Sequence, residues 1–424
     1  MQVIYERCAA VDVGKDVIAV AVRMPGDGPG GRVTVKRVYK TFYGVLREAA
    51  RWLVSEGVTH VAMEATGIYS MPVYHALVEH GDFEKVLVCN AGHVKNVPGR
   101  KTDMADAEWL CQLLECGLLA GSFIPPADVK AARDVIRYRA KIAQQRVSEI
   151  ARLANVLQDA GIKLDSVAWS VSTKSGRLMI EALIDGERRG QVLADLAIGR
   201  MRKKIPELSM ALEGRFEEHH AMLCRLHLDH LDHLDHLDGT LAKLDAQIES
   251  MMAPFRAARD LLITIPGIGA LSAASVISEI GADVRGYFPD AAHLASWAGL
   301  CPGNHESAGR HRTGKRRKGN QHLQPVLVEC AWAAVRHEGY LKALYHRHVM
   351  KWGGYRSSTA KSKAIIVVAH AILVIIWHVL ATGKPYDELG SDYFTRRLDP
   401  EREAQRLIAR LQALGKRVTL EDAA

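Results

Sequence analysis

Residues 8–22 of the chain read CAAVDVGKDVIAVAV, an apolar and largely β-branched run that contains the acid Asp12. Valine and isoleucine favour strands, and the sequence Gly14-Lys15-Asp16 is typical of a tight turn. The stretch therefore predicts two antiparallel strands, with Asp12 at the end of the first. A carboxylate buried there is costly unless a cation or hydrogen-bond donors compensate its charge. The two interpretations are a metal ligand and an aspartate that only caps the turn.

The elements that follow alternate between strands and helices, which indicates parallel strand pairing through crossover helices. We expect strands at residues 32–39, 58–63 and 85–89, and helices at 43–56, 69–80 and 103–119. Glu64 follows one of these strands, and Asp103 and Asp106 share one face at the start of the last helix, behind the N-cap Thr102. For that pair the alternative is that two acids only balance the helix dipole.

Carboxylates from two strand ends and one helix start can surround a hard cation such as Mg²⁺ or Mn²⁺. Bound ions of this kind activate a nucleophile and neutralise a scissile phosphate. The candidate catalytic and metal-binding residues are therefore Asp12, Glu64, Asp103 and Asp106.

The composition indicates an ordinary soluble globular protein with a polyanionic partner. The chain has 424 residues, enough for two or three domains, with 48% hydrophobic residues and a net charge of +8. Its 7 cysteines form no CxxC pair, which argues for a reducing cytosol and against zinc. We expect no signal peptide, and we interpret the apolar run 364–381 as a buried helix, with a membrane span as the remote alternative.

The middle of the chain predicts long helices. Residues 127–160 carry basic side chains that either bind nucleic acid or form a solvated face: Arg133, Arg137, Arg139, Lys141 and Arg146. Residues 207–253 predict a second helix, which contains the repeat LDHLDHLDHLD at 228–238. Its histidines suggest a metal site, but a repeat expansion on a solvated helix is the preferred interpretation. We expect the two long helices to form an antiparallel hairpin or coiled coil.

Two glycine-containing segments suit phosphate binding. Pro266-Gly267-Ile268-Gly269 separates two helical runs and predicts a helix-hairpin-helix element, with a glycine-rich turn between packed helices as the alternative. Residues 299–320 predict a basic loop that grips a nucleic-acid backbone. Its candidate binding residues are Arg310, Arg312, Lys315, Arg316, Arg317, Lys318 and Asn320.

The motifs VDVGKD, MEATG and KTDMADA together resemble the DEDD, RuvC-like domain of bacterial transposases of the insertion-sequence one-ten family. The later motifs GLCP, ESAG and KGN resemble the small C-terminal domain of the same family. The resemblance implies a ribonuclease-H-like fold, in which Asp12, Glu64, Asp103 and Asp106 match the four family acids and Ser307 matches a nucleophilic serine. Two departures are Ser-Ala-Gly where Ser-Gly is usual and Gln324 where a basic residue is common.

The resemblance also implies a domain organisation and a reaction. The expected parts are an α/β RuvC-like domain at 1–123, a helical coiled-coil linker that dimerises at 124–256, a mostly α transposase domain at 257–390 and a tail at 391–424. The implied activity is Mg²⁺-dependent strand exchange through a covalent serine–DNA intermediate, guided by an element-encoded structured (bridge) RNA that pairs with donor and target DNA. Homodimers pairing into a tetramer, a cytoplasmic location at the nucleoid and no membrane partner complete the expectation.

Two other functions stay open on the sequence alone. A metal-dependent nuclease of the Holliday-junction type would use water as nucleophile and leave Ser307 with a structural role. A non-catalytic nucleic-acid-binding protein would use only the helix-hairpin-helix element and the basic loop. Acids at strand ends speak against the second function, because they repel phosphate unless a metal intervenes.

Overall fold

The computed structural model describes residues 2–28, 31–90, 106–302, 305–307, 310–313, 318–396 and 400–419, with only the backbone described at 231–234, 236–237, 305–307, 310–313 and 402–403. The chain divides into two compact units, Met1–Ile124 and Pro125–Ala424. Each unit has its own buried side chains.

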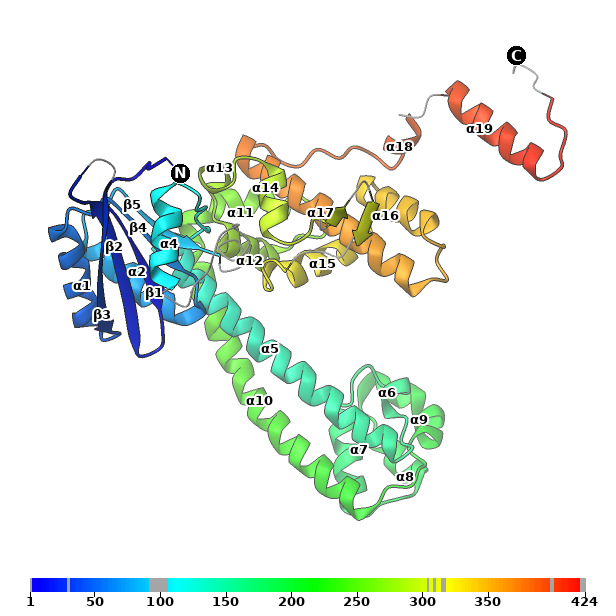
Figure 1. Ribbon diagram of the computed structural model, residues 1–424. Coiled ribbons are helices and arrows are strands. Elements are labelled where there is room, and N and C mark those ends of the chain that lie inside the picture. Colours follow the sequence, from blue (N-terminus) through cyan, green and yellow to red (C-terminus); the bar gives the residue numbers. More distant parts are fainter. Residues whose placement is uncertain are drawn as a thin grey trace. The chain divides into compact units, whose positions relative to one another are not determined.

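The first unit is built on a mixed five-stranded sheet in the order β3-β2-β1-β4-β5 (Figure 1). The strands are β1 (Cys8–Val13), β2 (Val17–Pro25), β3 (Arg32–Lys40), β4 (His60–Glu64) and β5 (Lys85–Cys89). The helices are α1 (Tyr43–Ser55), the short η1 (Gly67–Tyr69), α2 (Ser70–His80) and α4 (Asp106–Glu115). The first three strands are antiparallel, whereas β4 and β5 run parallel to β1. The predicted order of strands and crossovers is therefore present.

The two faces of this sheet carry side chains of different size. Branched and long residues such as Val11, Val20 and Met63 pack against α1 and α2 on one face. Small residues, among them Ala10 and Ala62, line the other face beneath α4. Short side chains let a helix approach the sheet closely. Because large and small side chains alternate along β1, α4 can pack closer to the sheet than α1 and α2 do.

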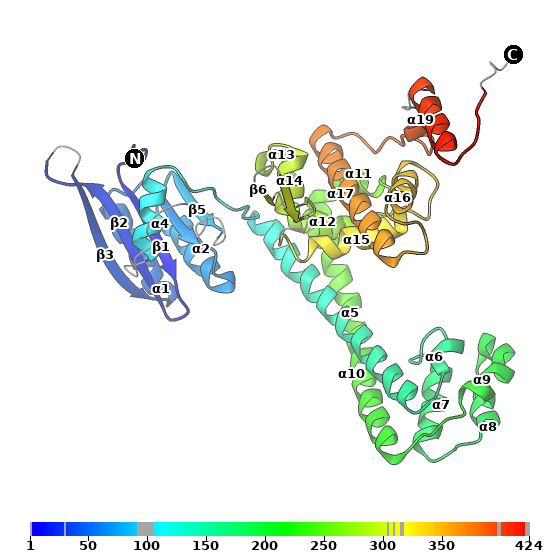
Figure 2. The same ribbon diagram turned by 45° about the vertical axis from the view of Figure 1, so that its right-hand side comes forward.

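The second unit begins with two long helices that pack side by side and antiparallel, α5 (Ala127–Asp159) and α10 (Glu218–Met251). Ion pairs that join Arg139 to Asp245 and Arg146 to Asp235 establish the opposite directions. At the far end of the pair lies a helical tip (Figure 2). The tip consists of α6 (Leu164–Val167), α7 (Lys174–Ile184), α8 (Gly190–Asp195), η2 (Gly199–Lys204) and α9 (Ile205–Ala211), with its own core.

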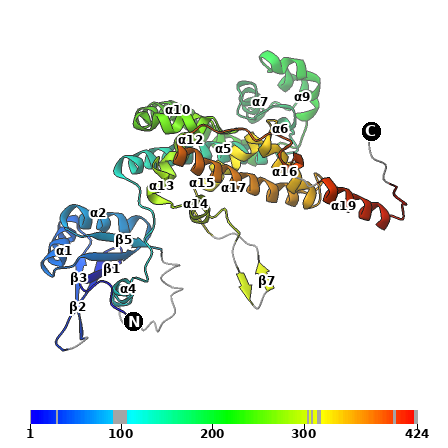
Figure 3. The ribbon, with the colours of Figure 1, turned by 90° about the horizontal axis from the view of Figure 1, so that it is seen from above.

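A helical group follows α10, joined by the single turn η3 (Ala253–Phe255). It contains α11 (Arg256–Ile263), α12 (Ala270–Ile280), α13 (Val284–Tyr287), α14 (Ala291–Trp297), α15 (Leu323–Ala334), α16 (Tyr340–Lys351) and α17 (Ser358–Thr382). A two-stranded ribbon, β6 (His305–Ser307) and β7 (Arg310–Thr313), lies between α14 and α15 (Figure 3). The chain continues through α18 (Tyr393–Arg396) and α19 (Pro400–Ala413).

Helix α17 is the one described helix with the length and apolar composition of a membrane span. The Ser357 hydroxyl accepts a hydrogen bond from the Ala360 N–H at its start, and Gly383 ends it in the left-handed conformation. It packs against α11 and α13–α16, and Ile372, Leu373 and Ile376 on it are fully buried. These contacts are those of the core helix that the sequence predicted.

Three expectations about elements differ from the structure. The single helix expected at 207–253 is two helices, because the chain turns between Leu212 and Glu217 so that Phe216 can enter the core of the tip. The loop expected at 299–320 contains the ribbon β6–β7, since the chain reverses and pairs with itself. The helix expected from 103 begins at Asp106 in the described part, and Thr102 and Asp103 lie outside the described residues.

Candidate active site

Two of the predicted acids occupy the same level of neighbouring parallel strands. Val11 of β1 pairs with Met63 of β4, and the next residues along the two strands are Asp12 and Glu64. Side chains at equal level on parallel strands lie on the same face of the sheet. Asp12 and Glu64 lie two positions after Ala10 and Ala62, which are beneath α4, so both acids belong to the α4 face. Both are half-buried.

The direction of α4 brings a third acid to the same end of the sheet. The backbone N–H of Ile4, just before β1, donates to the Glu115 carbonyl at 2.8 Å, and the sulfurs of Cys8 and Cys111 lie 3.8 Å apart. The carboxyl end of α4 therefore lies at the start of β1, and the helix runs back along the strand. Asp106 is its first residue and therefore lies at the end of α4 that is nearer to the strand end with Asp12.

The chemistry of these side chains fits a hard divalent cation. The described candidate ligands, Asp12, Glu64 and Asp106, carry carboxylate oxygens, the donor type that Mg²⁺ and Mn²⁺ prefer. The adjacent thiol differs: burial, and then the charge of Glu64, raises the pKa of Cys89 to about 11, so this thiol is neutral at neutral pH. Asp16 lies on the exposed turn that follows Gly14, as the sequence predicted.

In the second unit, Ser307 is the last residue of β6 and stands opposite Arg310 of β7. Arg312 belongs to the same ribbon, and Lys318 is exposed beyond it. Lys315, Arg316 and Arg317 lie outside the described residues. The ribbon thus places the candidate serine and two arginines on one short hairpin.

Two glycines close the base of this segment. The backbone of Gly319 passes so near to Ala298 and Gly299 that a β-carbon on it would lie 2.3 Å from the Ala298 carbonyl oxygen. Gly299 has φ +71°, a conformation that glycine adopts without strain. The Gln324 amide donates to the Ala298 carbonyl at 2.7 Å. Gln324 therefore holds the base of the segment.

Asn320 is committed to contacts within the protein. Its amide nitrogen donates to Glu279 Oε2 at 2.7 Å, and its side-chain oxygen accepts from the N–H groups of His322 and Leu323, which caps α15. Asn320, which was predicted to bind nucleic acid, thus makes structural hydrogen bonds within the protein. Loss of hydration, followed by the charge of Arg137, lowers the pKa of the neighbouring His322, so its imidazole is neutral at neutral pH.

The predicted helix-hairpin-helix glycines differ in their surroundings. Gly267, at φ +86°, packs so tightly on α15 that a β-carbon would lie 2.2 Å from the Cys330 carbonyl oxygen. Gly269 is the N-cap of α12 and has open space on its β-carbon side. The α12 N-terminus is therefore the accessible part of this turn.

Four of the basic residues expected on α5 have acidic partners in the protein. Arg133 and Arg137 pair with Glu279, Arg139 pairs with Asp245, and Arg146 pairs with Asp235 and Asp238. Neither interpretation from the sequence, a nucleic-acid-binding face or a solvated face, describes these four residues. Lys141 remains exposed.

Comparison with known families identifies both halves of this arrangement. Residues 9–162, which contain the paired strand-end acids, match a family model for the DEDD domain of IS110 elements, described as "Transposase". Residues 259–346, which contain the ribbon, match the model described as "Transposase IS116/IS110/IS902 family". The chain belongs to the IS110 family of transposases.

Individual relatives of this IS110-family transposase span most of its length. A putative transposase y4pF/y4sB of Sinorhizobium fredii is 25% identical over 80% of this chain and 77% of its own. The transposase for insertion sequence element IS1328 of Yersinia enterocolitica is 22% identical over 69% of this chain and 75% of its own. A mini-circle putative transposase for IS117 of Streptomyces coelicolor is 30% identical, over 30% of each chain.

Family membership assigns the α/β unit of this IS110-family transposase to the ribonuclease-H-like fold and makes the protein a DNA-recombining enzyme. DEDD transposase domains depend on divalent metal ions, in agreement with Asp12 and Glu64 at the same level of adjacent strands. Glu279, which accepts a hydrogen bond from Asn320 at the base of the ribbon, was not predicted from the sequence. An acid inside the apolar stretch SVISEIG was the available signal.

Proposed function

We propose that this transposase moves an insertion sequence by metal-dependent DNA cleavage and strand exchange, with Ser307 as nucleophile. Asp12, Glu64, Asp103 and Asp106 would hold Mg²⁺, or Mn²⁺ in its place. The bound cation would supply positive charge at the scissile phosphate. The observation that carries this proposal is the equal level of Asp12 and Glu64 on adjacent strands, on the face where α4 begins with Asp106.

The chemical step is an exchange of phosphate esters. Ser307 gives up its hydroxyl proton and its Oγ forms a bond to phosphorus, while the bond from phosphorus to one deoxyribose oxygen breaks and that oxygen takes up a proton. The DNA strand is then attached to the protein through a phosphoserine ester. Attack by a hydroxyl of another strand reverses the step, so the energy of the ester is retained for joining.

We further propose that specificity comes from an element-encoded structured RNA that pairs with donor and target DNA. Arg310, Arg312 and Lys318, with Lys315, Arg316 and Arg317, would hold the nucleic-acid backbone. The α12 N-terminus after Gly269 would offer free N–H groups to a phosphate, as in a helix-hairpin-helix element.

The acids and Ser307 belong to separate domains, which favours a composite site assembled from two subunits. We assign the RuvC-like domain to 1–123, the linker to 124–256, the serine domain to 257–390 and a tail to 391–424. The antiparallel pair α5 and α10 would form the coiled coil that dimerises, and two dimers would give a tetramer on DNA at the nucleoid.

The test is a search for DNA covalently attached to the protein. The full chain is incubated with Mg²⁺, the noncoding RNA of its element and labelled target DNA, and the products are separated on a denaturing gel. A protein-linked band is expected, and it should vanish in both Ser307→Ala and Asp12→Ala. Asp16→Asn, which changes an exposed acid of the neighbouring turn, is the matched control and should retain the band.

The second candidate is a nuclease of the Holliday-junction type that uses water. It predicts free cleaved ends without an adduct, at a rate that Ser307→Ala does not change but Asp12→Ala abolishes. That result would keep the metal site and remove the serine from the mechanism. Nucleic-acid binding without cleavage, unaffected by Asp12→Ala and by Mg²⁺, would reject both enzymatic proposals.

A further inference from the structure

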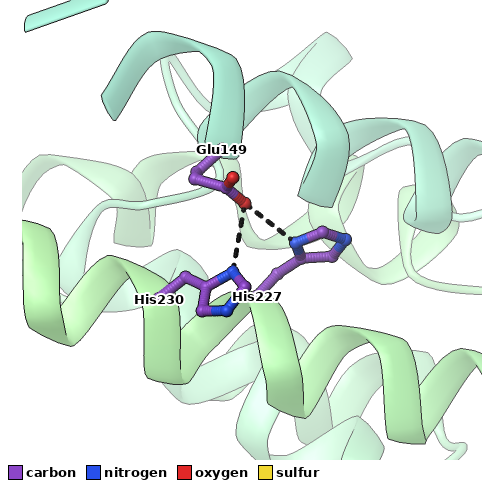
Figure 4. Close-up of side chains that lie close together, drawn as sticks. All are labelled: Glu149, His227 and His230. Carbon is purple, nitrogen blue, oxygen red and sulfur yellow. Dashed lines mark hydrogen bonds and ion pairs between the residues drawn. The ribbon is translucent and has the colours of Figure 1, made fainter. Parts of the chain in front are cut away.

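A second group of metal-ligating side chains lies between α5 and α10. Glu149 of α5 faces His227 and His230 of α10 (Figure 4). The carboxylate oxygen Oε2 is 3.1 Å from His227 Nδ1 and 3.5 Å from His230 Nδ1. One ligand atom from each residue lies within 4.8 Å of the others. Two helices thus direct an oxygen and two nitrogens toward one point.

The separations match the edges of a tetrahedral zinc site. Bonds from zinc to imidazole nitrogen and carboxylate oxygen are about 2.0–2.1 Å long, so ligand atoms at tetrahedral angles lie about 3.3–3.4 Å apart. The two measured separations, 3.1 and 3.5 Å, lie on either side of this value. A hydrogen bond accounts for the first but is long for the second. Both separations are compatible with ligand atoms around one cation.

The surroundings prepare Glu149 to act as a ligand. Its side chain is 14% exposed and that of His227 is 17% exposed, whereas His230 is 62% exposed and opens the group to solvent. Arg152 binds the other carboxylate oxygen, Oε1, which leaves Oε2 to the imidazoles.

We propose that Glu149, His227 and His230 bind one Zn²⁺ ion, with water as the fourth ligand, and that this ion cross-links α5 to α10. Two imidazoles and one carboxylate favour zinc over Mg²⁺, so this site differs in chemistry from the carboxylates of the first unit. The neighbouring Leu153 and Leu228 belong to the core of the tip. Zinc would therefore fasten the two long helices where that core begins.

Another group, Asp159 with His219 and His220, is less suited to a metal. His220 Nδ1 accepts the backbone N–H of Glu217, and its Nε2 lies 3.1 Å from an Asp159 oxygen. Both ring nitrogens of His220 thus have partners in the protein, and the Asp159 side chain is 77% exposed. These three residues serve as the comparison in the experiment.

The experiment measures zinc binding by the full chain without a polyhistidine tag. Metal is removed with a chelator, and Zn²⁺ is added in competition with a chromogenic chelator. We expect one tight site per chain, and Co²⁺ in its place should give the intense visible absorption of a four-coordinate ion. Replacing both ligands in His227→Ala/His230→Ala should lower the affinity by more than about 100-fold, since loss of supporting residues alone costs about 10–100-fold.

Matched variants locate the site. His233→Ala/His236→Ala removes two histidines of the same repeat, and His219→Ala/His220→Ala removes the comparison pair; both should keep the tight site. Glu149→Gln preserves the side-chain shape and should weaken zinc binding even if the double histidine variant unfolds. Saturating Zn²⁺ should raise the unfolding temperature of the wild-type chain and of both control variants, and should leave that of His227→Ala/His230→Ala unchanged. Equal affinity in the wild type and His227→Ala/His230→Ala, or equal loss in either control, would overturn the assignment.

Discussion

The guanidinium of Arg137 donates two parallel hydrogen bonds to the carboxylate of Glu279, each 2.7 Å long. Arg137 belongs to α5 and Glu279 to α12, 142 positions later in the chain. The same carboxylate accepts the amide of Asn320, which caps α15 at the base of the ribbon. One buried acid therefore connects a long helix of the pair with the segment that carries Ser307.

Breaking this contact should destabilise the second unit. Glu279→Gln leaves the buried cation of Arg133 and the partly buried cation of Arg137 without their counter-charge, and the expected loss is about 3–5 kcal/mol of unfolding free energy. Hydrogen exchange of the α12 amides in urea measures it. Glu249→Gln removes the partner of Arg259 at a 59% exposed carboxylate and should cost at most about 1 kcal/mol. Equal losses in the two variants would mean that Glu279 has no special role.

Acid should weaken the same region. Burial opposes ionisation of Glu279, but hydrogen bonds from Arg137 and Asn320 outweigh it, so its pKa is lower in the folded chain than in the unfolded chain. The unfolded chain then binds more protons, and stability falls as pH drops from the unfolded pKa through the folded one. Exchange of the α12 amides between about pH 7 and about pH 3 should show this loss in the wild type. Glu279→Gln should lack that component, and an unchanged acid profile in the variant would contradict it.

The contact at the base of the ribbon should exclude any side chain larger than hydrogen. Gly319→Ala places a β-carbon 2.3 Å from backbone atoms of Ala298, so the chain must shift at a cost of about 1–3 kcal/mol. Thermal unfolding of the full chain measures the effect, and the adduct assay should show reduced cleavage. Gly239→Ala, in α10 with no atom within 4 Å of the new carbon, should instead stabilise the chain by about 0.5–1 kcal/mol. An unchanged unfolding temperature in Gly319→Ala would show that the backbone at the base of the ribbon can shift without cost.

The helical tip should depend on its own core. Met179 of α7 is fully buried, and Met179→Ala should cost about 2–5 kcal/mol through lost burial and a residual cavity. Met210→Ala, at a 69% exposed position of α9 in the same tip, should change stability by about 0.5 kcal/mol or less. Hydrogen exchange of α7 and α8 distinguishes the two variants. If protection falls equally in both, the tip lacks a specific core.

Local patterns predicted the elements of the first unit because its strands are rich in β-branched residues and are bounded by turn residues. The placement of Asp12 and Glu64 on adjacent strands could be predicted, because alternating strands and helices imply parallel pairing. The partner of Glu279 could not be predicted, since nothing in its local sequence points to an arginine so distant along the chain. The break before α10 also depends on distant packing, because Phe216 is held by the tip core. Asp103 lies outside the described residues, and the role of Ser307 remains a prediction.

The near contact of Gly299 and Gly319 bears on how much the length of the segment between them can change. A segment whose two ends meet can be lengthened, shortened or replaced without moving the helices on either side, and the entropy of closing it changes only slowly with its length. The two glycines fix the positions of α14 and α15 at the ends of this segment, so we expect a change in its length to leave these helices in place. A chain in which the corresponding segment of a relative is grafted between the two glycines should therefore unfold at the same temperature as the wild type.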